Sequence, residues 1–204
     1  MHEELAAAIR TSFRDGVPVA DGVFDALYPE TLRELSSSQW TPVAAAVRAA
    51  ALLAPRPGMR VLDGGAGPGK LCCIGALVSD ASWYGVERNI ALVETARQTA
   101  AALGVATRAT FQSADVLALG WEEFDSVYLF NPFEGARIRE KSAHLTAWIR
   151  YVDEIERVEM KLAGLRSGMR VVTYHGFGGE MPAGFALLSS ELIGIGMLDL
   201  WEKR

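Results

Sequence analysis

Hydrophobic positions along this chain follow two alternating patterns. From about residue 60 onward, short continuous apolar runs alternate with longer segments in which apolar residues recur every three to four positions. The first pattern predicts buried strands and the second predicts helices. The predicted strands are 60–63, 83–87, 109–113, 125–130, 170–174, 185–190 and 196–202, and the predicted helices are 70–78, 90–103 and 143–165.

This alternation of strands and helices predicts an α/β fold, with a mostly parallel sheet that is covered on both faces. Right-handed crossovers place the carboxyl ends of the parallel strands, and with them a ligand crevice, at one edge of the sheet. The last two predicted strands are joined only by Gly194-Ile195-Gly196. They therefore predict an antiparallel hairpin at one side of the sheet.

The first third of the chain has a different pattern. Residues 1–35 are amphipathic with helical spacing and are interrupted near Gly16-Val17-Pro18 and Tyr28-Pro29. After a polar link, Thr41-Pro42 predicts the start of a further helix that runs to about Ala54, with Thr41 as N-cap. We expect residues 1–39 to form an N-terminal helical lid and residues 40–204 to form the main domain.

Composition excludes some classes of partner. The chain has 204 residues, of which 50% are hydrophobic and 22% charged, with a formal net charge of −5. This balance is typical of a globular domain, and the lack of a polybasic run argues against a nucleic-acid acceptor. Neither a signal peptide nor a membrane-spanning run is recognisable, so we expect a cytoplasmic protein that is a monomer or a homodimer.

The two cysteines, Cys72 and Cys73, are adjacent. Adjacent cysteines do not connect distant parts of a chain, and their spacing does not match a metal site, so no metal is expected. They are predicted to be apolar residues at the start of a buried helix, with a redox-active pair as the alternative.

The strongest chemical signal follows the first predicted strand. Asp63 ends that strand, glycines stand at 64, 65, 67 and 69, and a helix begins after Lys70. Because glycine has no Cβ and accepts positive φ, such a turn lets backbone N–H groups and a helix N-terminus approach a ligand closely.

Three kinds of site share glycine turns of this type. Gly64-x-x-x-x-Gly69-Lys70 matches a P-loop, but Leu71 replaces the hydroxyl residue that would hold Mg²⁺. The dinucleotide-binding pattern counted from Gly65 requires glycine or alanine where Lys70 stands. Both readings therefore lack a required residue.

The third reading includes the acidic strand end. Asp63-x-Gly65-x-Gly67-x-Gly69 resembles the first motif of class I S-adenosylmethionine-dependent methyltransferases. The resemblance covers residues 40–204. It implies a Rossmann-like sheet of seven strands in the order 3-2-1-4-5-7-6 with an antiparallel last strand. It also implies that Asp63 holds the ammonium group of the cofactor and that Glu87, at the end of the second strand, accepts the ribose hydroxyls.

The same resemblance assigns further residues to the cofactor. Asp115, after the third strand, would accept the adenine amino group, and the neighbouring Arg88 and Val116 would border it. Ala66 belongs to the glycine turn. Trp40 and Thr41 would fold over the methionine end from the N-terminal side.

The fourth predicted strand leads into Asn131-Pro132-Phe133-Glu134. This segment resembles the Asn-Pro-Pro-aromatic motif of methyltransferases that act on amino nitrogens, although it lacks the second proline. The resemblance implies that Asn131 and Pro132 orient the acceptor nitrogen beside the cofactor and that Phe133 stacks on the acceptor. Glu134 would attract a cationic acceptor, and the alternative is a simple turn with Phe133 in the core.

His175 follows the fifth predicted strand and precedes a glycine-rich segment, 176–179. Because imidazoles exchange protons near neutral pH, His175 is a candidate general base, with a structural histidine as the alternative. Together these residues predict methyl transfer from S-adenosylmethionine, yielding S-adenosylhomocysteine, to a nitrogen or oxygen of a small molecule or protein side chain. The alternatives are a non-catalytic cofactor-binding subunit and a P-loop nucleotide-binding protein.

Overall fold

The computed structural model describes residues 2–34, 39–130 and 144–204. These residues form one seven-stranded sheet with the order β3-β2-β1-β4-β5-β7-β6. The strands are β1 (Arg60–Gly64), β2 (Ser82–Glu87), β3 (Ala109–Ser113), β4 (Ser126–Leu129), β5 (Arg170–Tyr174), β6 (Phe185–Ile193) and β7 (Gly196–Lys203). The predicted strand order is confirmed.

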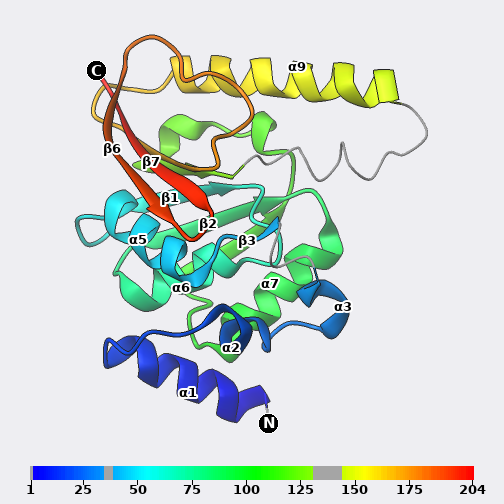
Figure 1. The fold of residues 1–204 in the computed structure, drawn as a ribbon, viewed down its shortest axis with the longest axis vertical. Coiled ribbons are helices and arrows are strands. Elements are labelled where there is room, and N and C mark those ends of the chain that lie inside the picture. The colour runs from blue at the N-terminus through cyan, green and yellow to red at the C-terminus, as the bar shows by residue number, and fades with distance from the viewer. Residues whose placement is uncertain (1, 35–38, 131–143) are drawn as a thin grey trace.

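The direction of the strands also matches the prediction. The first five strands pair in parallel, whereas β7 pairs antiparallel with both β5 and β6. The closing hairpin is drawn in orange to red in Figure 1. Since β1 to β5 are parallel, their carboxyl ends lie along one edge, and the chain segments that follow β1, β2 and β3 meet there.

Helices cover both faces of the sheet (Figure 1), and the buried side chains form two hydrophobic cores. The first core includes side chains of α5 (Val43–Leu53), α6 (Lys70–Val78) and α7 (Ile90–Ala102). The second core lies beneath α9 (His144–Ala163). Successive residues of β1 alternate between the two cores, because Val61 belongs to the first and Leu62 to the second.

Three short N-terminal helices pack outside the α5–α7 layer: α1 (His2–Arg14), α2 (Asp21–Asp25) and α3 (Glu30–Arg33). The predicted breaks near Gly16 and Pro29 lie between them. Ala6 and Ile9 of α1 are buried, and the Arg10 guanidinium donates to the carbonyl of Ala102 at the end of α7 (2.7 Å). Two 3₁₀ turns, η1 (Val116–Ala118) and η2 (Trp121–Glu123), were not predicted.

The predicted N-cap of α5 is wrong. The helix begins at Val43, and the Thr41 hydroxyl forms a hydrogen bond with the Tyr128 hydroxyl (2.7 Å) instead of a cap. The N–H of Val43 donates to Oδ1 of Asp21 (2.8 Å), a residue of α2. A carboxylate from a distant segment thus satisfies a helix N-terminus that the local sequence leaves open.

Within residues 2–34, 39–130 and 144–204, none of the helices combines the length and the apolar character needed to cross a bilayer.

Candidate functional site

The glycine turn after β1 is held by the backbone of β2. The N–H groups of Gly65 and Ala66 both donate to the carbonyl oxygen of Val86 (2.9 and 3.0 Å). Gly65, Gly67 and Gly69 have φ angles of 83°, 53° and 81°, which side-chain-bearing residues rarely adopt. At Gly69 a Cβ would also lie 2.6 Å from the Phe111 ring, so both backbone shape and packing require glycine there.

Glu87 connects the end of β2 to this turn. Its Oε2 accepts a hydrogen bond from the N–H of Gly67 (3.2 Å), and its Oε1 accepts one from the N–H of Asn89 (2.8 Å). The carboxylate is therefore held in place at the position predicted for the ribose. Asn89 in turn caps α7 by accepting from the N–H of Ala91 (3.0 Å).

Asp63 is a nearly completely buried carboxylate, 3% exposed, at the end of β1. Its pKa is raised to about 7, mainly by burial and also by the charge of Glu87, although a hydrogen bond from the Cys72 thiol to Oδ2 (3.4 Å) acts in the opposite direction. Among the described residues, no cationic side chain is paired with Asp63. A cationic group entering beside Asp63 would therefore stabilise its ionised form.

A cleft lies over Asp63 and the glycine turn. It encloses about 380 Å³, including the part that is open to solvent. The lining comes from the segment before α5, the ends of β1 and β4 and the start of α6: Gln39, Trp40, Thr41, Asp63, Gly64, Gly65, Ala66, Gly67, Pro68, Lys70, Leu71, Tyr128 and Phe130. The structure thus brings Trp40 and Thr41 to the same cleft as Asp63.

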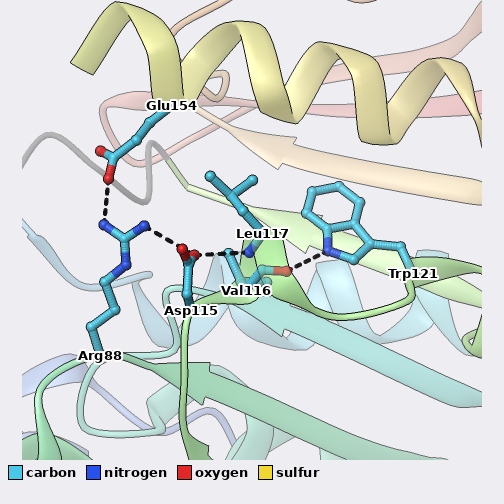
Figure 2. A network of polar contacts seen from close by, with 6 residues as sticks. All are labelled: Arg88, Asp115, Val116, Leu117, Trp121 and Glu154. Carbon is cyan, nitrogen blue, oxygen red and sulfur yellow. Dashed lines mark hydrogen bonds and ion pairs between the residues drawn. The ribbon is translucent and has the colours of Figure 1, made fainter. Parts of the chain in front are cut away.

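Arg88, which follows β2, and Asp115, which follows β3, point toward each other (Figure 2). The Arg88 guanidinium contacts Oδ1 of Asp115 (2.9 Å) and also Oε1 of Glu154, a buried residue of α9. Asp115 accepts a hydrogen bond from the N–H of Leu117 (2.9 Å) and so caps the 3₁₀ turn η1. Val116 is buried at the start of this turn.

The pKa of Asp115 reflects these contacts. Burial alone would raise it, but the hydrogen bonds from Leu117 and Arg88, together with the positive charge of Arg88, lower it below its usual value. Asp115 is therefore ionised at neutral pH. Asp115 thus both caps η1, as a strand-end aspartate often does, and pairs with Arg88.

Lys70, the residue that suggested a P-loop, is paired with carboxylates of the protein itself. Its ammonium group is buried between Asp21 (2.6 Å) and Asp25 (2.8 Å), both in α2. A P-loop lysine must reach bound phosphates. Here two carboxylates already neutralise the charge, which argues against phosphate binding at this turn.

His175 lies at the carboxyl end of β5 and has a φ of 56°, the only positive value among the described residues other than glycine. Its ring stacks on Phe130 at the end of β4, with centroids 5.7 Å apart and 24° between the planes. Its side chain is exposed. Strained backbone of this kind is often found at functional sites, and Phe130 places His175 next to the cleft.

Asn131, Pro132 and Phe133 lie outside the described residues, so their predicted contacts with an acceptor stay predictions. Among the residues that the structure covers, no group of three or more His, Cys, Asp or Glu side chains is arranged to hold a metal ion.

Sequence reasoning missed several residues that shape the cleft. Asp21, Asp25 and Tyr128 belong to segments far from the glycine turn, and no local motif marks them. Glu154 of α9 was missed for the same reason. The buried lysine itself was the available signal, because a lysine that starts an apolar helix needs acidic partners.

Comparison with known proteins identifies the family. Residues 55–172, more than half of the chain, match the model of a methyltransferase domain. No curated protein matches the chain.

The solved structures that share the fold include the following two. An RNA methyltransferase from Salinibacter ruber, in complex with S-adenosyl-L-homocysteine, is 18% identical over 86% of this chain and 92% of that chain, with a TM-score of 0.57. TrmN from Thermus thermophilus is 24% identical over 84% of this chain and 52% of that chain, with a TM-score of 0.59. At these identities the likeness establishes the fold alone. The family match and the strand order together show that the chain belongs to the class I S-adenosylmethionine-dependent methyltransferases.

Proposed function

We propose that this chain transfers the methyl group of S-adenosylmethionine to a nitrogen or an oxygen of a small molecule or of a protein side chain. The observation that carries the proposal is the pair of carboxylates at one sheet edge. Asp63 lines the cleft, and Glu87 is hydrogen-bonded to Gly67, which also lines it. The two residues end neighbouring parallel strands, so an extended ligand can reach both.

The residues present fit this cofactor. Asp63 is buried beside a thiol and near a second carboxylate, and a ligand ammonium group would supply the missing positive charge. Glu87 keeps a fixed orientation through Gly67 and Asn89, which suits a carboxylate that accepts two neighbouring hydroxyls. Arg88 and Asp115 continue the site in the direction expected for adenine.

S-adenosylmethionine, when bound, supplies a methyl group on a sulfonium centre, whose departure leaves a neutral thioether. The protein's part is to align the acceptor with that methyl group and to exclude water. Trp40 and Tyr128 are buried beside the cleft and restrict water there. An acceptor nitrogen or hydroxyl loses a proton as its new bond to carbon forms, and His175 is our candidate to receive it.

The acceptor side is proposed from fewer residues. Phe130 and His175 provide stacked rings at the mouth of the cleft. The resemblance of Asn131-Pro132-Phe133 to an amino-methyltransferase motif supports a nitrogen acceptor, with Glu134 attracting a cation.

We also propose that residues 1–39 act as a lid segment. The net charge of −5 favours acceptors other than nucleic acid.

Calorimetric titration with S-adenosylhomocysteine tests the cofactor half of this proposal. We expect one site per chain, and no binding at millimolar ligand by folded protein would refute it. Transfer of radiolabelled methyl groups to pooled amines, proteins and RNA tests the acceptor half. Activity that is lost in Asn131→Ala while cofactor binding persists would exclude a non-catalytic subunit, and labelling of RNA alone would contradict the proposed acceptor class.

A further inference from the structure

The N-terminal helix α2 is joined to the cofactor cleft by a buried group of charges. Lys70 is the first residue of α6 and follows Gly69 directly. Only 2% of Lys70 is exposed, and its ammonium group lies 2.6 Å from Asp21 and 2.8 Å from Asp25. Because a buried lysine without partners loses most of its hydration energy, this position depends on the two carboxylates.

Asp21 makes a second connection with the same oxygen atom. Its Oδ1 accepts hydrogen bonds from the Lys70 ammonium (2.6 Å) and from the N–H of Val43 (2.8 Å), the first residue of α5. The starts of two helices, α5 and α6, are therefore tied to one carboxylate. The start of α6 lines the cleft, and so do Trp40 and Thr41 just before α5, so this one carboxylate holds two parts of the cleft wall against each other.

The segment just before α5 carries the side chains that face the glycine turn. Thr41 is fixed by the Tyr128 hydroxyl (2.7 Å), and Trp40 packs against Tyr28 with ring centroids 4.8 Å apart. Tyr28 follows α2 closely in the chain. The helix α2 thus supports Trp40 through Tyr28 and supports Val43 through Asp21, on two sides of Thr41.

We infer that Lys70, Asp21 and Asp25 are positioning residues for the amino acid end of the cofactor. They fix the starts of α5 and α6 against each other and thereby hold Trp40 and Thr41 opposite Asp63. This inference rests on the proposed function. It also explains why a lysine follows the last glycine of the turn: the lysine binds the N-terminal segment and not a phosphate.

Two ligands separate this role from a general contribution to folding. S-adenosylhomocysteine carries the amino acid end, whereas 5′-methylthioadenosine has the same adenosine and thioether groups without it. Asp21 is about half exposed, so Asp21→Ala is expected to remain folded. Lys70→Met combined with Asp25→Asn provides a second variant, in which neutral side chains of similar size replace the buried pair. Asp80→Asn is the matched control, because Asp80 forms an exposed ion pair with Arg108.

For each variant, calorimetry gives the ratio of the two dissociation constants. We expect Asp21→Ala and Lys70→Met/Asp25→Asn to weaken binding of S-adenosylhomocysteine by about tenfold, with 5′-methylthioadenosine affected less than about twofold. The Asp80→Asn control should bind both ligands as the wild type does. Equal weakening for both ligands, or unchanged affinity for S-adenosylhomocysteine, would overturn the inference. A wild-type protein that binds neither ligand would instead contradict the proposed function itself.

Discussion

The proposed cofactor site has a methionine end near Asp63 and an adenosine end near Glu87, and at each end one cation bridges two carboxylates. At the methionine end, Lys70 bridges Asp21 and Asp25 and connects the glycine turn to α2. At the adenosine end, Arg88 bridges Asp115 and Glu154 and connects the loops after β2 and β3 to α9 (Figure 2). Each cation ties a segment at the carboxyl edge of the sheet to a helix from a distant part of the chain.

The exposure of each ion pair to solvent decides how strongly it affects stability and binding. The Lys70 side chain is 3% exposed, whereas those of Arg88 and Asp115 are 42% and 34% exposed. Water and salt therefore screen the Arg88–Asp115 pair but reach the Lys70–Asp25 pair, whose side chains are 3% and 7% exposed, poorly. We therefore expect the methionine end to respond strongly to substitution and pH, and the adenosine end to respond weakly and to depend on ionic strength.

The largest expected effect is on stability at the methionine end. Lys70→Met leaves the Asp25 carboxylate buried beside Asp21 and should lower the free energy of unfolding by about 3–5 kcal/mol. Adding Asp25→Asn should restore part of that loss, because the buried negative charge that faced Lys70 is then removed. Urea unfolding of the single and double variants measures both values, and a single variant as stable as the wild type would contradict the buried ion pair.

The next effect concerns Asp63 and pH. Because the pKa of Asp63 is raised to about 7 by burial, the carboxylate is protonated below that pH and loses its attraction for an ammonium group. Affinity for S-adenosylhomocysteine should therefore fall by up to about tenfold per unit as the pH drops below 7. In Asp63→Asn, binding of S-adenosylhomocysteine should be weaker than in the wild type by about 2–3 kcal/mol at every pH from 6 to 8. A wild-type affinity that stays the same from pH 6 to 8 would refute this role of Asp63.

Without ligand, Asp63 should make the folded protein less stable as the pH rises, whereas its affinity for the ligand increases. Its pKa is higher in the folded state than in the unfolded chain, so the folded state binds the proton more tightly and stability falls as the pH rises from about 4 to 7. Asp63→Asn removes this cost and should stabilise the free protein by about 2–4 kcal/mol at pH 8. Thermal unfolding at pH 5 and pH 8 measures the difference, and equal stabilisation at both pH values would disagree with it.

A smaller effect is expected at Glu87, between the two ends. Glu87→Ala removes the carboxylate predicted to hold the ribose and should weaken S-adenosylhomocysteine and 5′-methylthioadenosine alike, by about 1–3 kcal/mol. Glu94→Ala, which removes a largely exposed carboxylate of α7, is the control. Unchanged affinity in Glu87→Ala would place Glu87 outside the site.

The smallest effect is predicted for Asp115 at the exposed end. Asp115→Asn keeps an acceptor for the N–H of Leu117 but removes the charge that faces Arg88, and should weaken cofactor binding by at most about 1 kcal/mol. The loss should shrink further in 1 M salt. A loss as large as that of Asp63→Asn would show that the two ends do not differ as proposed.

The sequence predicted most of the fold because its signals are local. Strand ends, glycines with positive φ and the apolar periods of the helices all lie within short windows, and they yielded the strand order through the family resemblance. The prediction of Thr41 as the N-cap of α5 was wrong because the contacts that decide it are not local. Thr41 has the right side chain, but Tyr128 and Asp21 come from distant segments and compete for the groups involved.

The residues of the candidate site divide in the same way, into those with a local sequence signal and those without one. Asp63 and the glycine turn form one local motif and Glu87 ends the next strand, so their places at one sheet edge could be predicted from the sequence. The partners of Lys70 and Arg88 could not, since Asp21 precedes Lys70 by 49 residues and Glu154 follows Arg88 by 66. Only the fold brings such pairs together, and a single sequence does not report them.

The central claim is that one cleft binds S-adenosylmethionine between Asp63 and Glu87. Calorimetric titration of S-adenosylhomocysteine into the wild type and into the folded Asp63→Asn/Glu87→Ala variant tests it most directly. We predict one site per wild-type chain and no detectable binding by the variant at the same concentrations. Equal binding by both proteins, or none by the wild type, would contradict the account.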